Sequence, residues 1–264
     1  MPTHAAVAGF NLAAEAYERG RPGYPAEAIA YLRETLGLGP GRRIVDLGAG
    51  TGKFTRAMAG TGATVVPVEP TRAMRLVLHR LDPGAPVLAA VSERLPLRTG
   101  SVDGVVAGQA FHWFASSGTV DEIVRVLRPG GGIGLVWNTR DESLPWTAKL
   151  GALINAHETG TPKYKGTGWQ RVFEGRPDLT PLEHRAFVHA QRLDVETLVD
   201  RVLSVSFIAL LSPAERQELA AKVRTLIATD PATRDRPALE LPYRTDVYTT
   251  RRLPGVDRGD PAAP

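Results

Sequence analysis

The spacing of apolar residues along the chain predicts helices and strands that alternate. In Pro25–Gly37, the apolar residues Ile29, Leu32 and Leu36 fall on one helical face, a proline opens the segment and a glycine closes it. Short apolar runs with a strand-like composition follow, and helical patterns separate them. This alternation is typical of α/β proteins with a mainly parallel sheet.

The pattern predicts seven strands. Five of them lie at 42–48, 63–70, 85–91, 101–109 and 131–138, with helices predicted over 53–59, 71–81 and 118–131. The alternation of strands and helices ends after residue 138. Residues 139–180 are irregular apart from an amphipathic pattern over 145–158. Beyond them, the pattern predicts strands at 183–194 and 241–253, helices at 194–207 and 212–227, and a disordered tail.

Composition sets the broad class of the protein. The chain has 264 residues, of which 43% are hydrophobic, and this fits one large domain or two small ones. It contains no cysteine, which excludes disulfides, thiolate metal sites and cysteine nucleophiles, and we expect no metal. The net charge of +4 comes from dispersed arginines, so we expect no nucleic-acid partner. Without an apolar run of eighteen residues or a secretory leader, we expect a cytoplasmic protein without a membrane partner.

Three glycines at alternate positions follow an apolar run in Ile44–Phe54, IVDLGAGTGKF. A dinucleotide fold has the pattern G-x-G-x-x-G, but position 53 is a lysine and the third glycine is Gly52. The Gly-Lys-Ser/Thr of a phosphate loop is also absent at its spacing. Asp46 lies two residues before the first glycine, where an acid would repel a pyrophosphate and suits a cationic amino group. The loop therefore indicates a ligand that has an amino group and no phosphate.

A second acid stands at the end of the next predicted strand. Glu69 follows the first glycine of the loop by about 20 residues, a position from which a carboxylate can accept both hydroxyls of a ribose. The same logic places an acid in dinucleotide folds. Glu69 therefore indicates a nucleoside ligand, and it does not separate a dinucleotide such as NAD from a nucleoside without a phosphate.

The stretch Asp46–Gly52, DLGAGTG, resembles the first motif of the class I S-adenosylmethionine-dependent methyltransferases. That cofactor has an amino-acid end, a sulfonium and an adenosine, but no phosphate. Gly108–Phe114, GQAFHWF, and the leader Phe10–Pro25, FNLAAEAYERGRPGYP, resemble a subgroup with a methyltransferase type 11 domain that includes trans-aconitate methyltransferase-like enzymes. The resemblance covers about residues 10–250 and is densest between 44 and 146.

The resemblance implies a cofactor site and a role for several of its residues. The implied cofactor-binding residues are Tyr17, Arg21, Asp46, Gly48, Ala49, Gly50, Gly52, Glu69, Ser92, Glu93, Gln109 and Ala110. Arg21 suits the cofactor's carboxylate, as bidentate guanidinium contacts do. Many relatives carry an aspartate near residue 92 that binds the adenine amino group; here Val91 or Ser92 stands near that place, with Glu93 beside it.

The resemblance also implies where the methyl acceptor would bind. The implied pocket residues are Phe111, Trp113, Trp137, Trp146, Tyr164 and Trp169, and His112 is the best-placed candidate for a general base. A structural histidine is an equally good interpretation of His112. Cationic residues at 163, 165 and 171 are interpreted as solvated loop charges, with carboxylate binding as the alternative.

The implied fold is a Rossmann-like α/β domain. It has a seven-stranded, mostly parallel sheet with an antiparallel last strand, helices on both faces, an N-terminal lid helix and a helical cap insertion after the fifth strand. The domain spans residues 1–264: an N-terminal lid and first helix (10–40), a cofactor-binding core (42–138), a cap and substrate region (139–212), a final helix and strand (213–252) and a disordered tail (253–264).

The implied reaction is in-line transfer of a methyl group from S-adenosylmethionine to oxygen, nitrogen or carbon of a small molecule, carboxylates included. The loop after residue 108 lacks the Asn/Asp-Pro-Pro-aromatic string of enzymes that methylate exocyclic amino groups of nucleic acids. Two other functions stay open, an NAD-type oxidoreductase and a non-catalytic protein that binds the cofactor. We expect a monomer or a homodimer.

Overall fold

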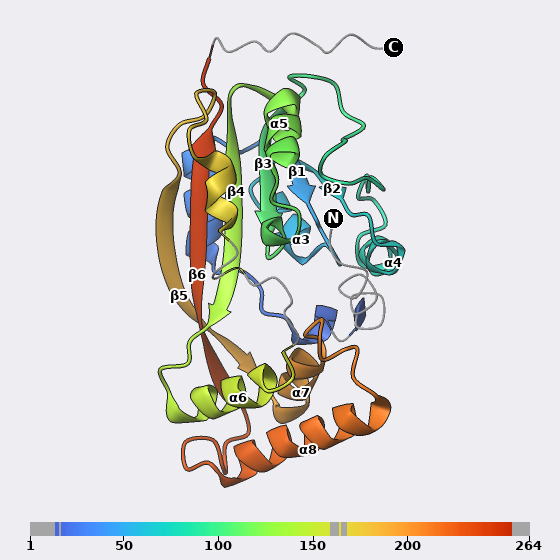
Figure 1. The fold of residues 1–264 in the computed structure, drawn as a ribbon, viewed down its shortest axis with the longest axis vertical. Coiled ribbons are helices and arrows are strands. Elements are labelled where there is room, and N and C mark those ends of the chain that lie inside the picture. Colours follow the sequence, from blue (N-terminus) through green and yellow to red (C-terminus); the bar gives the residue numbers. More distant parts are fainter. Residues whose placement is uncertain (1–13, 16, 159–163, 165–167, 255–264) are drawn as a thin grey trace.

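One six-stranded mixed sheet forms the centre of the molecule (Figure 1). The computed structural model describes residues 14–15, 17–158, 164 and 168–254. Its strands are β1 (Arg43–Leu47), β2 (Thr64–Val68), β3 (Val102–Gly108), β4 (Leu127–Arg140), β5 (Glu183–Leu193) and β6 (Leu239–Arg251), in the order β2-β1-β3-β4-β6-β5. The first four pair in parallel, and β6 is antiparallel to both β4 and β5. The expected α/β class and the antiparallel last strand are confirmed.

The predicted strand at 85–91 is wrong. Only one parallel bridge forms there, between Val68 and Leu88, with Leu88 N–H donating to Pro67 and Leu88 accepting from Glu69. Pro86 has no N–H for a ladder and interrupts the apolar run that suggested a strand. The described sheet therefore has six strands in place of seven, and β2 is its edge.

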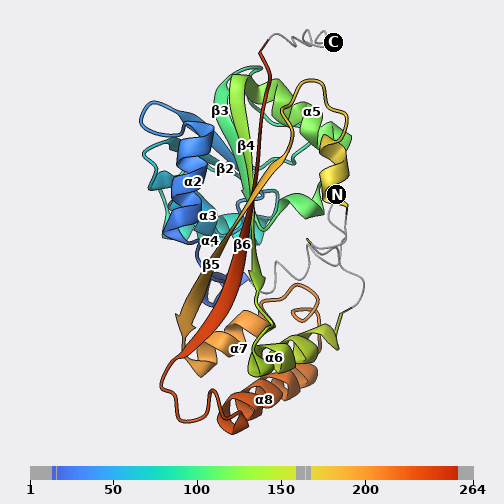
Figure 2. The ribbon, with the colours of Figure 1, turned by 90° about the vertical axis from the view of Figure 1, so that its left-hand side faces the viewer.

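Helices cover both faces of the sheet, as predicted. α2 (Ala26–Leu36) and α3 (Lys53–Ala59) share a buried cluster with one face, and α5 (Ser117–Val126) and the short helix η2 (Trp169–Phe173) share one with the other. Figure 2 shows α2 and α5 on opposite sides of the sheet. α4 (Arg72–Leu81) follows β2.

Three further helices form a separate layer beyond the carboxyl end of β4 (Figure 1). α6 (Pro145–Asn155), α7 (Val195–Leu203) and α8 (Pro213–Thr229) enclose their own hydrophobic cluster. α8 begins with a capping box in which Ser212 and Glu215 exchange hydrogen bonds. α6 ends three residues before the predicted end at 158. The role of this layer as a cap stays a prediction.

The N-terminal segment lies against α4. Its described helical residues are 14–15 and 17–20, and Ala14 and Tyr17 pack with Met74 and Val77 of α4. The segment enters the molecule between the sheet and α7 (Figure 1). The remainder of the predicted leader, residues 10–13 and 16, and the tail from 255 onward lie outside the described residues.

Candidate functional site

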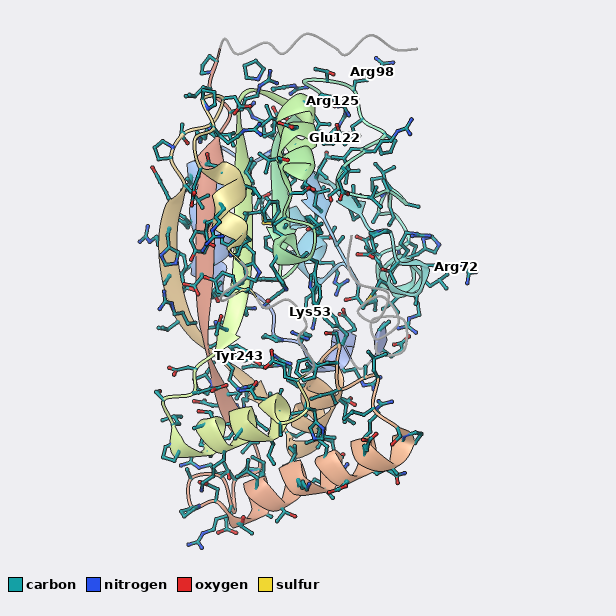
Figure 3. All side chains as sticks on the ribbon, viewed as in Figure 1. Lys53, Arg72, Arg98, Glu122, Arg125 and Tyr243 are labelled. Atoms are coloured by element: carbon teal, nitrogen blue, oxygen red, sulfur yellow. The ribbon has the colours of Figure 1, made fainter. Side chains whose placement is uncertain are left out.

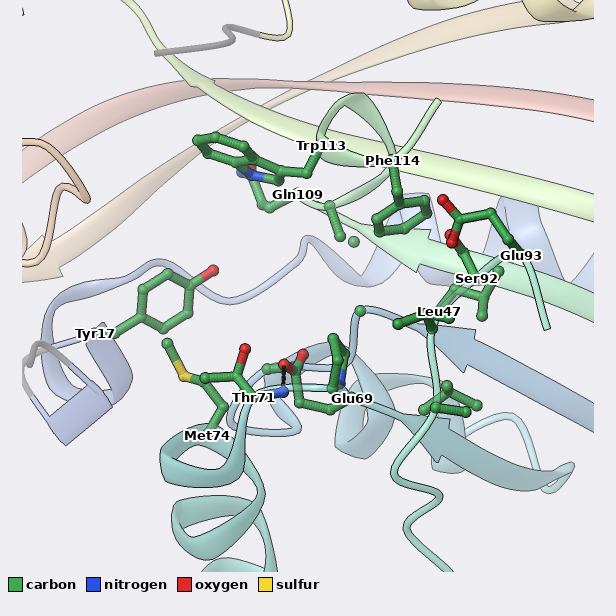
Figure 4. A pocket seen from close by; sticks show the side chains of 18 residues that line it. Tyr17, Leu47, Glu69, Thr71, Met74, Ser92, Glu93, Gln109, Trp113 and Phe114 are labelled. Carbon is green, nitrogen blue, oxygen red and sulfur yellow. Dashed lines mark hydrogen bonds between the residues drawn. The ribbon is translucent and has the colours of Figure 1, made fainter. Parts of the chain in front are cut away.

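A cavity opens where three parallel strands end (Figure 4). Leu47, Val68 and Gly108, the last residues of β1, β2 and β3, all line it. Ligands bind at this edge in open α/β sheets. Nine of the predicted site residues also line the cavity: Tyr17, Gly48, Gly50, Glu69, Ser92, Glu93, Gln109, Ala110 and Trp113.

Part of the cavity wall escaped the sequence analysis. Thr71, Met74 and Phe114 line the cavity together with the apolar ends of the strands. Thr71 and Met74 lie outside the quoted motifs, and Phe114, for which no cofactor or pocket role was predicted, is the last residue of GQAFHWF. Their one signal is position, because each follows a strand by a few residues and so stays near the carboxyl edge of the sheet.

The glycine loop uses its backbone N–H groups inside the protein. Gly48 and Ala49 both donate to the carbonyl of Val68, at 2.8 and 3.1 Å, and Gly50 donates to Glu69 Oε2 at 2.9 Å. A phosphate-binding loop instead points such groups at the anion. These three N–H groups are already bonded, so the loop favours a ligand without phosphate, as Asp46 also indicated.

Gly48 and Gly50 are glycines for different reasons. Both have a positive φ, 68° and 58°, which side-chain-bearing residues rarely adopt. A Cβ on Gly48 would lie 2.8 Å from the Cβ of Ala110, so packing excludes it. A Cβ on Gly50 would meet nothing within 4 Å, and it would occupy space beside the cavity. Gly52 also has a positive φ and precedes α3.

Glu69 is held rigidly on the cavity wall. Its Oε2 accepts from Gly50 and its Oε1 accepts from the N–H of Thr71 at 2.7 Å, as the dashed line in Figure 4 shows. The side chain is buried, and burial raises its pKa above the usual value for a glutamate. A carboxylate has about four acceptor sites, so two backbone donors leave capacity for the hydroxyls of a ligand.

Asp46 lies beneath the loop, away from the lining of the cavity. Thr55 Oγ1 donates to its Oδ2 at 2.6 Å, and its Oδ1 is buried without a hydrogen-bond partner. Burial raises the pKa of Asp46 to about 7. Its unpartnered oxygen can accept from a cationic donor, and the predicted contact with an amino group stays a prediction.

Ser92 and Glu93 form the opposite end of the cavity from Tyr17 (Figure 4). Ser92 Oγ donates to Glu93 Oε2 at 2.9 Å and lies 3.0 Å from Thr119 Oγ1. The turn is closed by a bridge between Val91 and Arg94. The predicted polar pair is therefore present on the cavity wall, where Thr119 of α5 contacts Ser92.

Gln109 adopts an unusual backbone conformation at the end of β3. Its φ is 60°, in the left-handed region, although it is not a glycine. Its N–H donates to Val136 at 2.8 Å, and its Nε2 donates to the carbonyl of Asn138 at 2.9 Å. Carbonyl groups of the neighbouring strand β4 therefore fix both the backbone N–H and the side-chain amide of Gln109. Strained residues of this kind cluster at functional sites.

Lys53 ties the N-terminal segment to the glycine loop. Its Nζ donates to the carbonyls of Glu18 and Arg21 at 2.6 and 2.7 Å. Glu18 accepts from Thr51 and Arg56 in turn, each at 2.5 Å. The lysine that breaks the dinucleotide pattern thus serves to hold the segment that carries Tyr17 and Arg21.

Arg21 lies outside the cavity wall. Its guanidinium stacks over the ring of Tyr17, 4.8 Å from the centroid, and its Nε is buried without a hydrogen-bond partner. Burial and the nearby Arg201 lower its pKa to about 10. Its predicted contact with the cofactor's carboxylate stays a prediction.

His112 is a weak base in this structure. Trp137 Nε1 donates to its Nδ1 at 3.0 Å. Burial, together with the charge of Arg21, lowers the pKa of His112 to about 4. The imidazole is therefore neutral at physiological pH, and its Nε2 carries the proton.

The remaining aromatic residues of the predicted acceptor pocket pack in the protein core. Trp137, Tyr164 and Trp169 form one cluster with ring centroids 4.5 to 6.3 Å apart, and Phe111 joins Trp169 at 6.0 Å. Trp146 belongs to the layer of α6–α8. None of these five lines the cavity. Large aromatics are buried because burying them removes much apolar area from water, so their type alone does not identify a pocket.

Within the residues that the structure describes, no group of three or more histidine, aspartate or glutamate side chains could hold a metal ion. Of the described helices, none combines the length and apolar character needed to span a membrane.

Known proteins resemble the chain along most of its length. A family model described as a methyltransferase domain matches residues 45–134. An uncharacterized methyltransferase of Mycobacterium tuberculosis is 41% identical over 237 residues, which cover 89% of this chain and 92% of the relative. An uncharacterized methyltransferase-like protein of Schizosaccharomyces pombe is 33% identical over 239 residues, covering 90% of this chain and 93% of the relative.

The fold is also similar to a solved structure with bound ligands. It is phosphoethanolamine N-methyltransferase 2 of Haemonchus contortus, in complex with phosphomonomethylethanolamine and S-adenosylhomocysteine. The TM-score is 0.52 at 15% identity, and the similarity covers 92% of this chain and 57% of that chain. At this identity the similarity concerns the fold alone.

Proposed function

Because the chain belongs to the methyltransferase family, we propose that it uses S-adenosylmethionine to methylate a small molecule. One observation carries the choice of cofactor. Glu69 stands on the cavity wall with acceptor capacity for a ribose, while the N–H groups of Gly48, Ala49 and Gly50 are already bonded within the protein. This combination fits a nucleoside without a pyrophosphate.

The described residues fit the cofactor at three points. Glu69 would hold the ribose hydroxyls, and the open space over Gly50 admits a ligand close to the backbone. The unpartnered Oδ1 of Asp46 suits the ammonium of the amino-acid end. Ser92 and Glu93 provide polar atoms at the other end of the cavity, where the adenine would bind.

When bound, the cofactor supplies an electrophilic methyl group. The chain must align an acceptor atom and exclude water, and orientation of this kind can lower a barrier by about 7–11 kcal/mol in favourable cases. Trp113 and Gln109 stand at the same end of the cavity as Tyr17 (Figure 4), and they would bound the space in which the acceptor lies.

His112 is the neighbour of Trp113 and our candidate for contact with the acceptor. Because its Nδ1 accepts from Trp137, its Nε2–H can donate to an acceptor oxygen and position it. The role of general base predicted from the sequence needs an unprotonated Nε2, which the contact with Trp137 disfavours. Positioning by donation is therefore the role that we propose.

Calorimetric titration with S-adenosylhomocysteine, with NAD in a parallel titration, tests this function. We expect micromolar binding of S-adenosylhomocysteine and none of NAD. Binding of NAD alone would make the protein an oxidoreductase candidate. Binding of S-adenosylhomocysteine without product from any acceptor, in screens with S-adenosylmethionine, would favour the non-catalytic alternative.

A further inference from the structure

Three arginines meet where the N-terminal segment, β4 and α7 come together: Arg21, Arg140 and Arg201. We call them the arginine cluster. A Cβ on Gly20 would overlap the backbone nitrogen of Arg201, so the segment carrying Arg21 runs directly against α7. The segment is fastened there by an ion pair of 2.7 Å between Arg19 Nε and Asp200.

Tyr243 connects the other two arginines of the cluster. It pairs with Arg140 across β4 and β6, so the two side chains lie on the same face of the sheet. Its hydroxyl accepts from Arg201 Nε at 3.1 Å. Figure 3 shows Tyr243 beside the carboxyl end of β4, next to the layer of α6–α8.

The positive charge of the arginine cluster is not balanced within the described residues. Arg140 has an acidic partner, Glu142, at 2.6 Å. For Arg21 and Arg201, the described part of the chain offers no carboxylate within ion-pair distance, and the recorded side-chain contacts are with tyrosines. Burying charge without a counter-charge is costly, so a site of this composition calls for an anion.

Unused hydrogen-bond donors point to the same conclusion. Arg21 Nε, Arg140 Nε and Arg201 Nη1 are all buried without a partner. Arg201 is only 8% exposed. Burial and the charge of Arg201 lower the pKa values of both Arg21 and Arg140, in keeping with a position of Arg201 near each of them.

The arginine cluster adjoins the cavity. Arg21 stacks on Tyr17, which lines it, and the charge of Arg21 acts on His112, the neighbour of Trp113. Tyr17 and Trp113 stand at the end of the cavity farthest from Ser92 and Glu93 (Figure 4). The arginine cluster therefore lies at the end of the cavity opposite to the one where the adenine would bind, toward α7.

We propose that Arg140 and Arg201 bind an anionic group, a carboxylate or a phosphate, of the methyl acceptor. This inference rests on the proposed function. Arg21 lies between Arg201 and Tyr17 of the cavity wall, and under the proposed function it would face the cofactor's carboxylate. One carboxylate engages one guanidinium in a bidentate contact, so the remaining donors are available to a second anion.

Thermal unfolding in the presence of anions tests the proposal. The protein is titrated with sodium phosphate or sodium succinate, against sodium chloride at equal ionic strength, with and without saturating S-adenosylhomocysteine. We expect a saturable rise in the midpoint temperature with at least one of the two anions, because a ligand of the folded state stabilises it. The stronger anion distinguishes a phosphate-bearing acceptor from a carboxylate-bearing one. Equal effects of all three salts would overturn the proposal.

Two variants and a matched control locate the effect. Arg201→Gln and Arg140→Gln should each weaken anion binding by at least tenfold. Arg140→Gln is the safer test because Arg140 is partly exposed, whereas Arg201 is buried. Arg224→Gln, at an exposed position of α8, should leave the anion affinity unchanged. An undiminished effect in both cluster variants would refute the assignment.

Cofactor affinity separates this inference from the proposed function. Both cluster variants should bind S-adenosylhomocysteine within about twofold of the wild type. A parallel loss of S-adenosylhomocysteine affinity would show that these arginines serve the cofactor's own carboxylate, and would overturn the proposal. If the wild type does not bind S-adenosylhomocysteine, the proposed function fails, and the titrations without it still decide whether the cluster binds anions.

Discussion

Trp137 donates a hydrogen bond to His112, and this contact decides which nitrogen of the neutral imidazole carries the proton. The indole Nε1 lies 3.0 Å from the imidazole Nδ1, and an indole N–H can only donate. The Nδ1 lone pair is therefore used, and the neutral ring carries its proton on Nε2. A core tryptophan thus sets the chemistry of a residue beside the cavity.

Trp137→Phe should raise the pKa of His112 from its present value of about 4. The charged imidazole needs a proton on Nδ1, and the Trp137 N–H opposes that proton, so its removal favours the charged form. NMR titration of the His112 ring protons measures the change, with His112→Gln to assign the resonance. An unchanged or lower pKa would show that burial and the charge of Arg21 set the value without the hydrogen bond from Trp137. In the wild type, the pH profile of turnover should show no His112 inflection between pH 6 and 8.

Gly50→Ala should fold and bind S-adenosylhomocysteine poorly. Its positive φ costs an alanine roughly 1–2 kcal/mol of stability. The new methyl group meets no protein atom and stands beside the cavity. Gly100→Ala is the matched control, because Gly100 also has a positive φ and open space but does not line the cavity. Urea unfolding should show similar losses for both variants, and calorimetry a loss of affinity for Gly50→Ala alone. Equal affinities would show that the ligand does not approach Gly50.

Glu69→Gln should weaken the binding of S-adenosylhomocysteine by about 10- to 100-fold. This is the range expected when hydrogen bonds to a charged group are lost. It should also reduce stability, because the new amide group would face a backbone N–H of Gly50 or Thr71. Glu122→Gln is a suitable comparison, since Glu122 also accepts from a backbone N–H, that of Leu95, and does not line the cavity. An equally strong effect of Glu122→Gln on affinity would mean that the loss is not specific to the ribose contact.

Asp46 should make the protein less stable as the pH rises. Its folded pKa of about 7 lies above the ordinary aspartate value of 3.8, so the folded state binds the proton more tightly, and this stability is lost as the pH rises from the lower to the higher of these values. Relative to the wild type, Asp46→Asn should gain about 2–3 kcal/mol between pH 5 and pH 8. Urea unfolding at the two pH values measures the gain. Asp141→Asn, at an exposed carboxylate, should show no comparable gain. A constant difference for Asp46→Asn would contradict the raised pKa.

Local pattern predicted much of the fold. The helix over 53–59 and the strands around the glycine loop were placed correctly because apolar periodicity and glycine boundaries are local properties. The strand predicted at 85–91 is wrong. A strand pairs with its neighbour through N–H groups of its own, and Pro86 within this segment has none. For the site, nine predicted residues line the cavity, because each follows a strand end. The aromatic residues 111, 137, 146, 164 and 169 do not line this cavity, and their place in an acceptor pocket stays a prediction, since burial in the core and exposure in a pocket select the same side chains.

The sequence by itself determined the α/β class, the glycine loop without a phosphate pattern, and the position of Glu69 after the loop. These features depend on residue type and spacing along the chain. The tertiary structure alone decided that Lys53 fastens the N-terminal segment, that Trp137 fixes the tautomer of His112, and that Arg21, Arg140 and Arg201 meet. Those residues lie on different elements, and no local periodicity records the distance between atoms that folding brings together.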